Sequence, residues 1–97
     1  MDRLANILEE TAALMESDGD HHWAKWLKRD AADLRRGDIG GATHFLSAFG
    51  GMGSLNDTYG RVGPSKPERE KTTIERICDR LDSAWHIASR LVRDSAK

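Results

Sequence analysis

The sequence predicts an all-α fold, a small antiparallel bundle of about four helices. Apolar residues recur at spacings of three and four in several segments, which is helical periodicity. No run of β-branched residues alternates with polar ones, and glycine and aspartate separate the periodic segments. A chain of 97 residues has room for one core, so we expect residues 1–97 to form a single helical domain.

A first helix is predicted over residues 2–17. Gly19 can end this helix in the left-handed conformation, and Asp20 is a good N-cap for the helix that follows. The predicted helix carries its apolar stripe on one face: Leu4, Ile7, Leu8, Thr11, Leu14 and Met15.

A second helix is predicted from about His21 to Arg36, with Gly37 as its C-terminal stop. Arg35 and Arg36 suit the negative end of its dipole. Its apolar face is formed by Trp23, Trp26, Leu27, Ala31 and Leu34.

A third, weaker helix is expected through the segment IGGATHFLSAF, with Asp38 as its cap. Gly40 and Gly41 each cost about 1 kcal/mol relative to alanine inside a helix. Such a cost is tolerable where one helix backbone must approach another closely. The apolar positions that keep the helical spacing are Ile39, Ala42, Phe45, Leu46 and Phe49.

The long C-terminal helix gives the clearest signal in the sequence. The residues SKPE read as a capping box between Ser65 and Glu68, after an irregular, glycine-rich segment over residues 50–65. The apolar stripe then continues for five turns through Ile74, Ile77, Cys78, Leu81, Ala84, Trp85, Ala88, Leu91 and Val92.

The charge and cysteine content narrow the function classes. Fifteen basic residues nearly cancel sixteen acidic ones, so nucleic acid and anionic membranes are not expected partners. The single cysteine, Cys78, excludes an intramolecular disulfide and zinc sites built on paired cysteines. There is no signal-peptide pattern at the start and no apolar run near the roughly 20 residues of a membrane span. A cytoplasmic protein is expected.

The usual catalytic motifs are absent, and we expect neither enzymatic activity nor a cofactor. The sequence has no G-x-S-x-G elbow, no H-E-x-x-H and no phosphate-binding P-loop. Cys78 lies on the apolar stripe and is expected to be a buried thiol. Asp18, Asp20, His21 and His22 resemble a metal-ligand cluster, but a capping turn explains them better and no metal site is predicted. His44 and His86 are expected to hydrogen-bond a neighbour.

The three tryptophans have two interpretations. Trp23 and Trp26 share one face of the second helix, and Trp85 lies on the stripe of the last helix. Burial in the core is favoured, because each ring removes a large apolar area from water. Contact with a partner is the alternative, because tryptophan is enriched at binding hot spots.

The segment GGMGSLND, residues 50–57, first resembles a phosphate-binding loop. Such loops follow a buried strand, whereas the residues before this segment read as helix. Ser54 and Asp57 fit a second capping box. With Asn56 and Tyr59 they gather polar groups where glycine allows a sharp bend, so a functional loop remains the alternative to a helix junction.

The tryptophan-bearing second helix, the following Gly37-Asp38 and the run LSAFGGMGSLND together resemble a family of small bacterial proteins of unknown function. The similarity covers roughly residues 4–57, and its most specific part is GGMGS-x-ND. After Asn56-Asp57 this chain departs from the family pattern. The resemblance implies no reaction; it suggests an immunity or accessory protein of a bacterial toxin system.

Two functions are carried forward from the sequence. The first is a non-enzymatic module that binds another protein, either a toxin or a second copy, as a monomer or homodimer. The alternative is a small-molecule or metal-binding protein that uses the 50–57 loop with His44, Asn56 and Asp57. A homodimeric structural protein is a further possibility. The expected partner-binding residues are Trp23, Trp26, Gly50, Gly51, Met52, Gly53, Ser54, Asn56, Asp57 and Tyr59.

Overall fold

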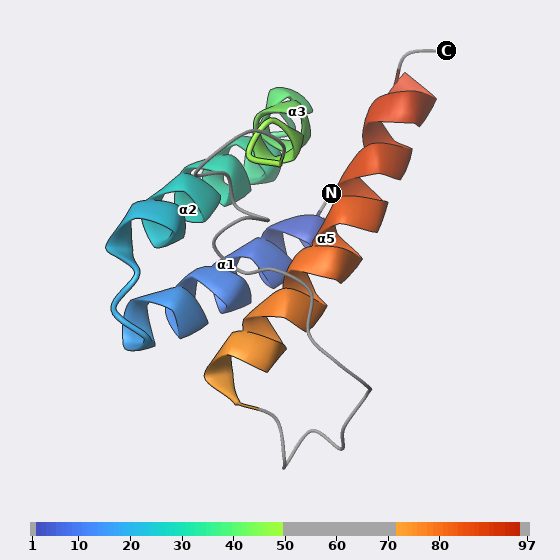
Figure 1. Cartoon of the computed structure of the whole chain (residues 1–97). Helices are drawn as coiled ribbons and strands as arrows, with labels where there is room; N and C mark the ends of the chain where they lie inside the picture. Colours follow the sequence, from blue (N-terminus) through green and yellow to red (C-terminus); the bar gives the residue numbers. More distant parts are fainter. Residues whose placement is uncertain (1, 50–71, 96–97) are drawn as a thin grey trace.

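The computed structural model describes residues 2–49 and 72–95, and every regular element within them is an α-helix, as predicted. The helices are α1 (Asp2–Ser17), α2 (His21–Arg35), α3 (Gly40–Leu46) and α5 (Thr73–Ser95). Helices α1 and α2 form a hairpin, α3 packs at the end of α2, and α5 crosses α1 and passes α3 (Figure 1). None of these four helices is long and apolar enough to cross a membrane.

The turns around α2 form where the sequence predicts them. Gly19 has φ +87° after the end of α1, and the Asp20 side chain accepts a hydrogen bond of 3.1 Å from the backbone N–H of Trp23. Gly37 has φ +81° just after α2. An L side chain is strained at such φ values, so both glycines fix the chain reversals that place α1, α2 and α3.

One hydrophobic core joins the four helices. Leu8, Leu27, Phe45 and Ile77 come from α1, α2, α3 and α5 in turn, and all four side chains are fully buried. Full burial of a side chain of this size stabilises the fold by about 1.5–3 kcal/mol. Because each helix contributes to the same core, α2 and α3 are held against each other by more than their own contacts.

The ends of the last two helices differ in detail from the sequence prediction. Helix α3 ends at Leu46. Its N-cap residue is Ile39, and the side chain of the preceding residue, Asp38, accepts a hydrogen bond of 2.8 Å from the backbone N–H of Gly40. The capping box predicted at residues 65–68 lies outside the described residues. At the start of α5, Thr72 and Glu75 form a reciprocal capping box, with two backbone-to-side-chain bonds of 3.2 Å.

The prediction that Trp85 lies on the core stripe of α5 is wrong. The buried positions of α5 are Ile77, Leu81, Ala84 and Ala88, which form a narrow line, whereas Trp85 is 41% exposed. Trp85 is displaced about 100° around the helix from Ala84. Since α5 packs against α1 and α3 on one side, a ring at that angle lies at the edge of the contact. Ile74, also predicted in the stripe, is 40% exposed.

Helix α3 approaches α2 closely at Gly41, as the paired glycines of the sequence suggest. A Cβ atom on Gly41 would lie 2.6 Å from the backbone carbonyl oxygen of Asp30 and 3.1 Å from side-chain atoms of Asp33 and Leu34. The neighbouring Gly40 faces outward, where a Cβ would meet only the Asp38 side chain. Glycine at 41 therefore sets the distance between the two helices.

We expect Gly41→Ala to destabilise the protein by about 1–3 kcal/mol, because the added methyl overlaps a backbone atom that cannot move independently. Gly40→Ala is the matched control. Its methyl displaces only a flexible carboxylate and gains helix propensity, so the free energy of unfolding should change by less than about 1 kcal/mol. Urea unfolding followed by circular dichroism measures both, and equal effects of the two variants would contradict the close-approach argument.

Candidate functional site

Asp30 is a charged residue inside the apolar face of α2. It lies one turn after Trp26, and its side chain is fully buried. A carboxylate removed from water is costly unless it is paired or hydrogen-bonded. The position of Asp30 therefore requires a polar partner from a neighbouring helix.

His44 of α3 is that partner. Its Nδ1 is hydrogen-bonded to Asp30 Oδ1, and its side chain is 38% exposed. His44 lies one turn after Gly41, on the side of α3 that faces α2. An ionised carboxylate only accepts hydrogen bonds, so the neutral imidazole donates through Nδ1–H and Nε2 becomes the acceptor. This confirms that His44 hydrogen-bonds a neighbour.

Trp26 covers one face of the His44 ring. The two ring centroids are 4.2 Å apart and the planes differ by 11°, which is a stacked arrangement. Trp23 packs against Trp26 at 5.1 Å, and His22 meets the edge of Trp23 at 4.8 Å. A row of aromatic rings thus runs along α2 and ends on α3. We call the surface around Trp26 and His44 the α2–α3 aromatic surface.

The environment of Asp30 changes its acidity. Burial raises the pKa of the Asp30 carboxyl to about 6, although the hydrogen bond from His44 and the charge of that ring act in the opposite direction. Asp33 raises this pKa and Arg29 lowers it, both by smaller amounts. The Asp30 carboxyl therefore has a perturbed pKa not far below neutral pH, a property common at functional sites.

Two buried polar atoms at this site have no hydrogen-bond partner among the described residues. They are Asp30 Oδ2 and Trp26 Nε1. One is an acceptor and the other a donor, and both belong to residues that contact the His44 ring. Polar atoms in such positions are usually satisfied by a proton, a water molecule or a ligand. The site can thus offer a donor, an acceptor and an imidazole within one small region.

The structure places the predicted partner-binding residues in different environments. Trp23 is a core residue, 8% exposed, so its predicted role in the core holds. Trp26 is half-buried and contributes to the α2–α3 aromatic surface. The remaining predicted residues lie outside the described part of the chain: Gly50, Gly51, Met52, Gly53, Ser54, Asn56, Asp57 and Tyr59.

The pairing of Asp30 with His44 does not appear in the sequence prediction. One signal for it is present: Asp30 falls between Leu27 and Leu34 on the apolar face of α2, where a charged residue is out of place. A charged residue inside an apolar stripe indicates a buried polar interaction. The identity of its partner depends on how α3 packs, and helical periodicity does not encode that.

The described residues give no support to a metal or thiol site. Residues 2–49 and 72–95 contain no group of three or more His, Cys, Asp or Glu side chains that could hold a metal ion. Asp20 instead caps α2, as predicted. Cys78 is half-buried against the core, and burial, with Asp79 and Glu75 nearby, raises the pKa of its thiol. A thiol in this state is a poor nucleophile.

Comparison with known proteins finds a family model that matches part of the chain. Residues 16–60 match the family described as Domain of unknown function (DUF6966). This segment includes α2 and α3, and with them Trp26, Asp30 and His44, but not α5. No curated protein and no solved structure is detectably similar to this chain. The match therefore marks the part of the chain that holds the α2–α3 aromatic surface and carries no statement about activity.

The Asp30 pKa predicts a pH dependence of stability. Because this pKa is higher in the folded protein than its ordinary value of 3.8, folding favours the protonated form. The resulting stabilisation is present below about pH 4 and is lost as the pH rises through about 6. Its full size is up to about 3 kcal/mol.

Asp30→Asn removes this titration and keeps a side chain that can hydrogen-bond His44. We expect the wild-type protein to lose stability relative to Asp30→Asn between pH 4 and pH 7, measured by urea unfolding at several pH values. Other carboxylates titrate alike in both proteins, so the difference isolates Asp30. Parallel pH profiles of stability for the two proteins would show that the pKa of Asp30 is not raised in the folded protein.

Proposed function

We propose that this protein is a non-enzymatic module that binds another protein through the α2–α3 aromatic surface. The observation that carries the proposal is the flat stack of His44 on Trp26, fixed by the hydrogen bond from His44 to the fully buried Asp30. Both rings are partly exposed and held in one orientation. The family match over residues 16–60 supports the same region.

A fixed aromatic pair is well suited to a binding hot spot. Binding usually costs the entropy of immobilising side chains at the interface, and this cost is small where packing already holds the rings. Tryptophan is among the residues most enriched at hot spots, where it fills a pocket in the partner. The exposed edge of His44 adds a polar group that a partner can recognise.

The basic residues beside this surface indicate the charge of the partner. Lys25 and Arg29 are exposed on α2 and flank Trp26 in the sequence, one before it and the other three positions after. Charged residues at the rim of an interface raise association rates and discriminate between partners. An acidic patch on the partner protein would complement them.

The more specific form of the proposal is an immunity protein that neutralises a cognate bacterial toxin. Its support is the resemblance of residues 4–57 to small bacterial proteins suspected of that role, together with a small helical scaffold and a preformed aromatic surface. In this form the partner is a toxin domain with an acidic surface, bound in a one-to-one complex.

A small-molecule site is the second candidate function. It rests on the unpartnered Asp30 Oδ2 and Trp26 Nε1 beside the His44 imidazole. Both atoms are buried, so a small polar ligand would have to displace the side chains that cover them in order to hydrogen-bond them. Two-dimensional NMR of the indole N–H groups during screening of metabolites distinguishes this candidate, because a ligand there would shift the Trp26 resonance saturably.

The binding function is tested by affinity purification of the full chain from its native host, with mass spectrometry of the proteins retained at stoichiometric yield. We expect Trp26→Ala and Arg29→Glu each to reduce the affinity for that partner at least tenfold. Arg29 is exposed, so its variant should keep the wild-type helical content and unfolding midpoint. Trp26→Ala removes a half-buried ring and is interpreted only where it remains folded.

Trp85→Ala is the matched control, because Trp85 is an exposed tryptophan on a helix outside the family match. Its affinity for the partner should equal that of the wild type. Recovery of no stoichiometric partner would end the proposal. Recovery of a partner that binds Arg29→Glu and Trp26→Ala normally would place the interface elsewhere.

A further inference from the structure

The outward-facing side of α5 carries exposed charged and aromatic residues. Asp82, Trp85, His86, Arg90 and Arg93 are all exposed, whereas the buried line of α5 faces α1 and α3. We call these five residues the α5 outer face. Its large ring and its charges lie outside the segment that matches the family, on a helix that contributes nothing to the α2–α3 aromatic surface.

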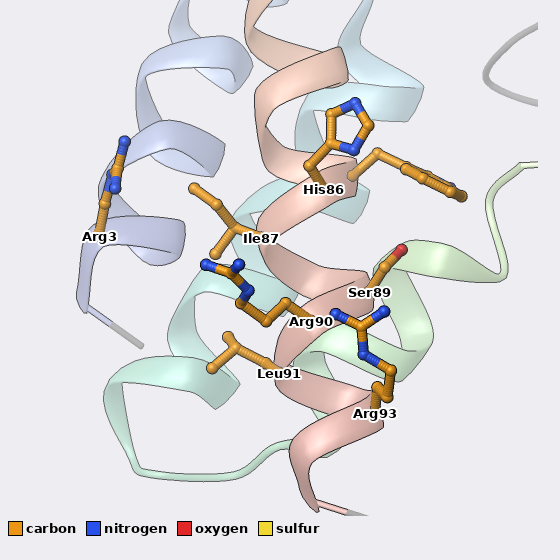
Figure 2. Close-up of a pocket in the computed structure, with 8 residues that line it drawn as sticks. Arg3, His86, Ile87, Ser89, Arg90, Leu91 and Arg93 are labelled. Atoms are coloured by element: carbon orange, nitrogen blue, oxygen red, sulfur yellow. The ribbon is translucent and has the colours of Figure 1, made fainter.

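The surface over the C-terminal half of α5 is open. A hollow of about 530 Å³ extends there along α5 and Arg3 of α1. In Figure 2, Ile87, Arg90 and Leu91 project toward the side where Arg3 lies, and Ser89 and Arg93 project from the other side of the helix. The lining residues therefore surround α5 and do not enclose a cavity. Such a surface suits another helix better than a small molecule.

The charges of the α5 outer face are arranged symmetrically about His86. Asp82 lies one turn before His86 and Arg90 one turn after it. Two turns away, Asp79 and Arg93 repeat the same order, although Asp79 is half-buried. Within the α5 outer face, the acidic residue Asp82 is thus in the N-terminal half, and the basic residues Arg90 and Arg93 are in the C-terminal half. This order makes the face complementary to itself in the reversed direction.

We propose that the α5 outer face binds the same face of a second copy of this chain, with the two α5 helices antiparallel. A two-fold axis near His86 would place Asp82 of each copy opposite Arg90 of the other. Two-fold interfaces use one patch twice, so a single favourable pair occurs twice. Arg90 and Arg93 have no ion pair within the described part of their own chain and are available for this contact.

The apolar contribution comes from Trp85. Trp85 precedes His86 in the sequence, and the proposed two-fold axis passes near His86. This axis would place the two copies of the Trp85 ring on the same side of the helix pair, close to the centre of the interface. Its 41% exposure in the isolated chain is then an area that the second copy covers. Aromatic side chains near the centre of an interface contribute the most to affinity.

The charge order also selects the arrangement. A parallel pair would place Asp82 against Asp82 and Arg90 against Arg90, and like charges in contact are destabilising. A partner with a purely acidic surface would meet Asp82, whose carboxylate lies 3.7 Å from His86 Nε2 and would be repelled. The antiparallel second copy is the occupant that satisfies both halves of the face.

Charge reversal tests the proposal. We expect the wild-type chain to dimerise weakly, with a Kd on the order of 10–100 μM in low salt, because a small and polar interface is transient. Asp82→Arg makes positions 82 and 90 both basic, and Arg90→Asp makes both positions acidic. Each variant alone should weaken its own dimer at least tenfold. An equimolar mixture of the two should form a heterodimer, because both opposing positions then carry opposite charges.

Sedimentation velocity at increasing concentration measures each state, and circular dichroism checks that the exposed substitutions leave α5 folded. Arg36→Asp, a charge reversal at the exposed C-cap of α2, is the control and should dimerise as the wild type does. A wild-type chain that stays monomeric at about 500 μM would overturn the proposal. Dimers that persist in both single variants, or a mixture that fails to associate, would overturn the antiparallel pairing. None of these outcomes depends on the α2–α3 aromatic surface.

Discussion

The buried carboxylate of Asp30 is the constraint on which the rest of the site depends. An acidic group on the apolar face of α2 needs a hydrogen-bond donor, and the donor is on α3. The donor reaches it because Gly41 has no side chain where the backbone of α3 meets the carbonyl of Asp30. With the distance between the helices fixed, the imidazole lies flat on Trp26. One polar bond, one missing side chain and one aromatic contact therefore specify the same geometry.

This geometry is not the main source of stability. Four large apolar side chains, one from each helix, are fully buried in the common core, and they account for much more burial than the aromatic pair. Removing the Asp30 carboxylate from water costs free energy, which its hydrogen bond to His44 offsets only in part. Burial raises the pKa of the Asp30 carboxyl to about 6, so the ionised form of this group lowers the stability of the fold at neutral pH. Perturbed pKa values of this kind cluster at functional sites.

The features that sequence reasoning predicted are the local ones. The positions of Gly19, Asp20 and Gly37 follow from backbone sterics and capping within a few residues, and the structure confirms them. The sequence prediction for Trp85 is wrong because helical periodicity gives the direction of an apolar face but not its width. That width depends on how many helices cover the face. The pairing of Asp30 with His44 joins two helices through their packing. No local rule encodes this pairing, although the position of the charged Asp30 among apolar residues of α2 indicates one of its two members.

The stack of His44 on Trp26 also gives the protein an internal optical reporter. A protonated imidazole in contact with an indole quenches its fluorescence, whereas a neutral one does so weakly. Any event that changes the charge of His44, lifts its ring or fills the space beside it alters the emission of Trp26. Trp85 lies on another helix, so its emission responds to different events, whereas Trp23, whose ring centroid is 5.1 Å from that of Trp26, belongs to the same aromatic cluster. The state of this small surface can thus be followed in solution without a label.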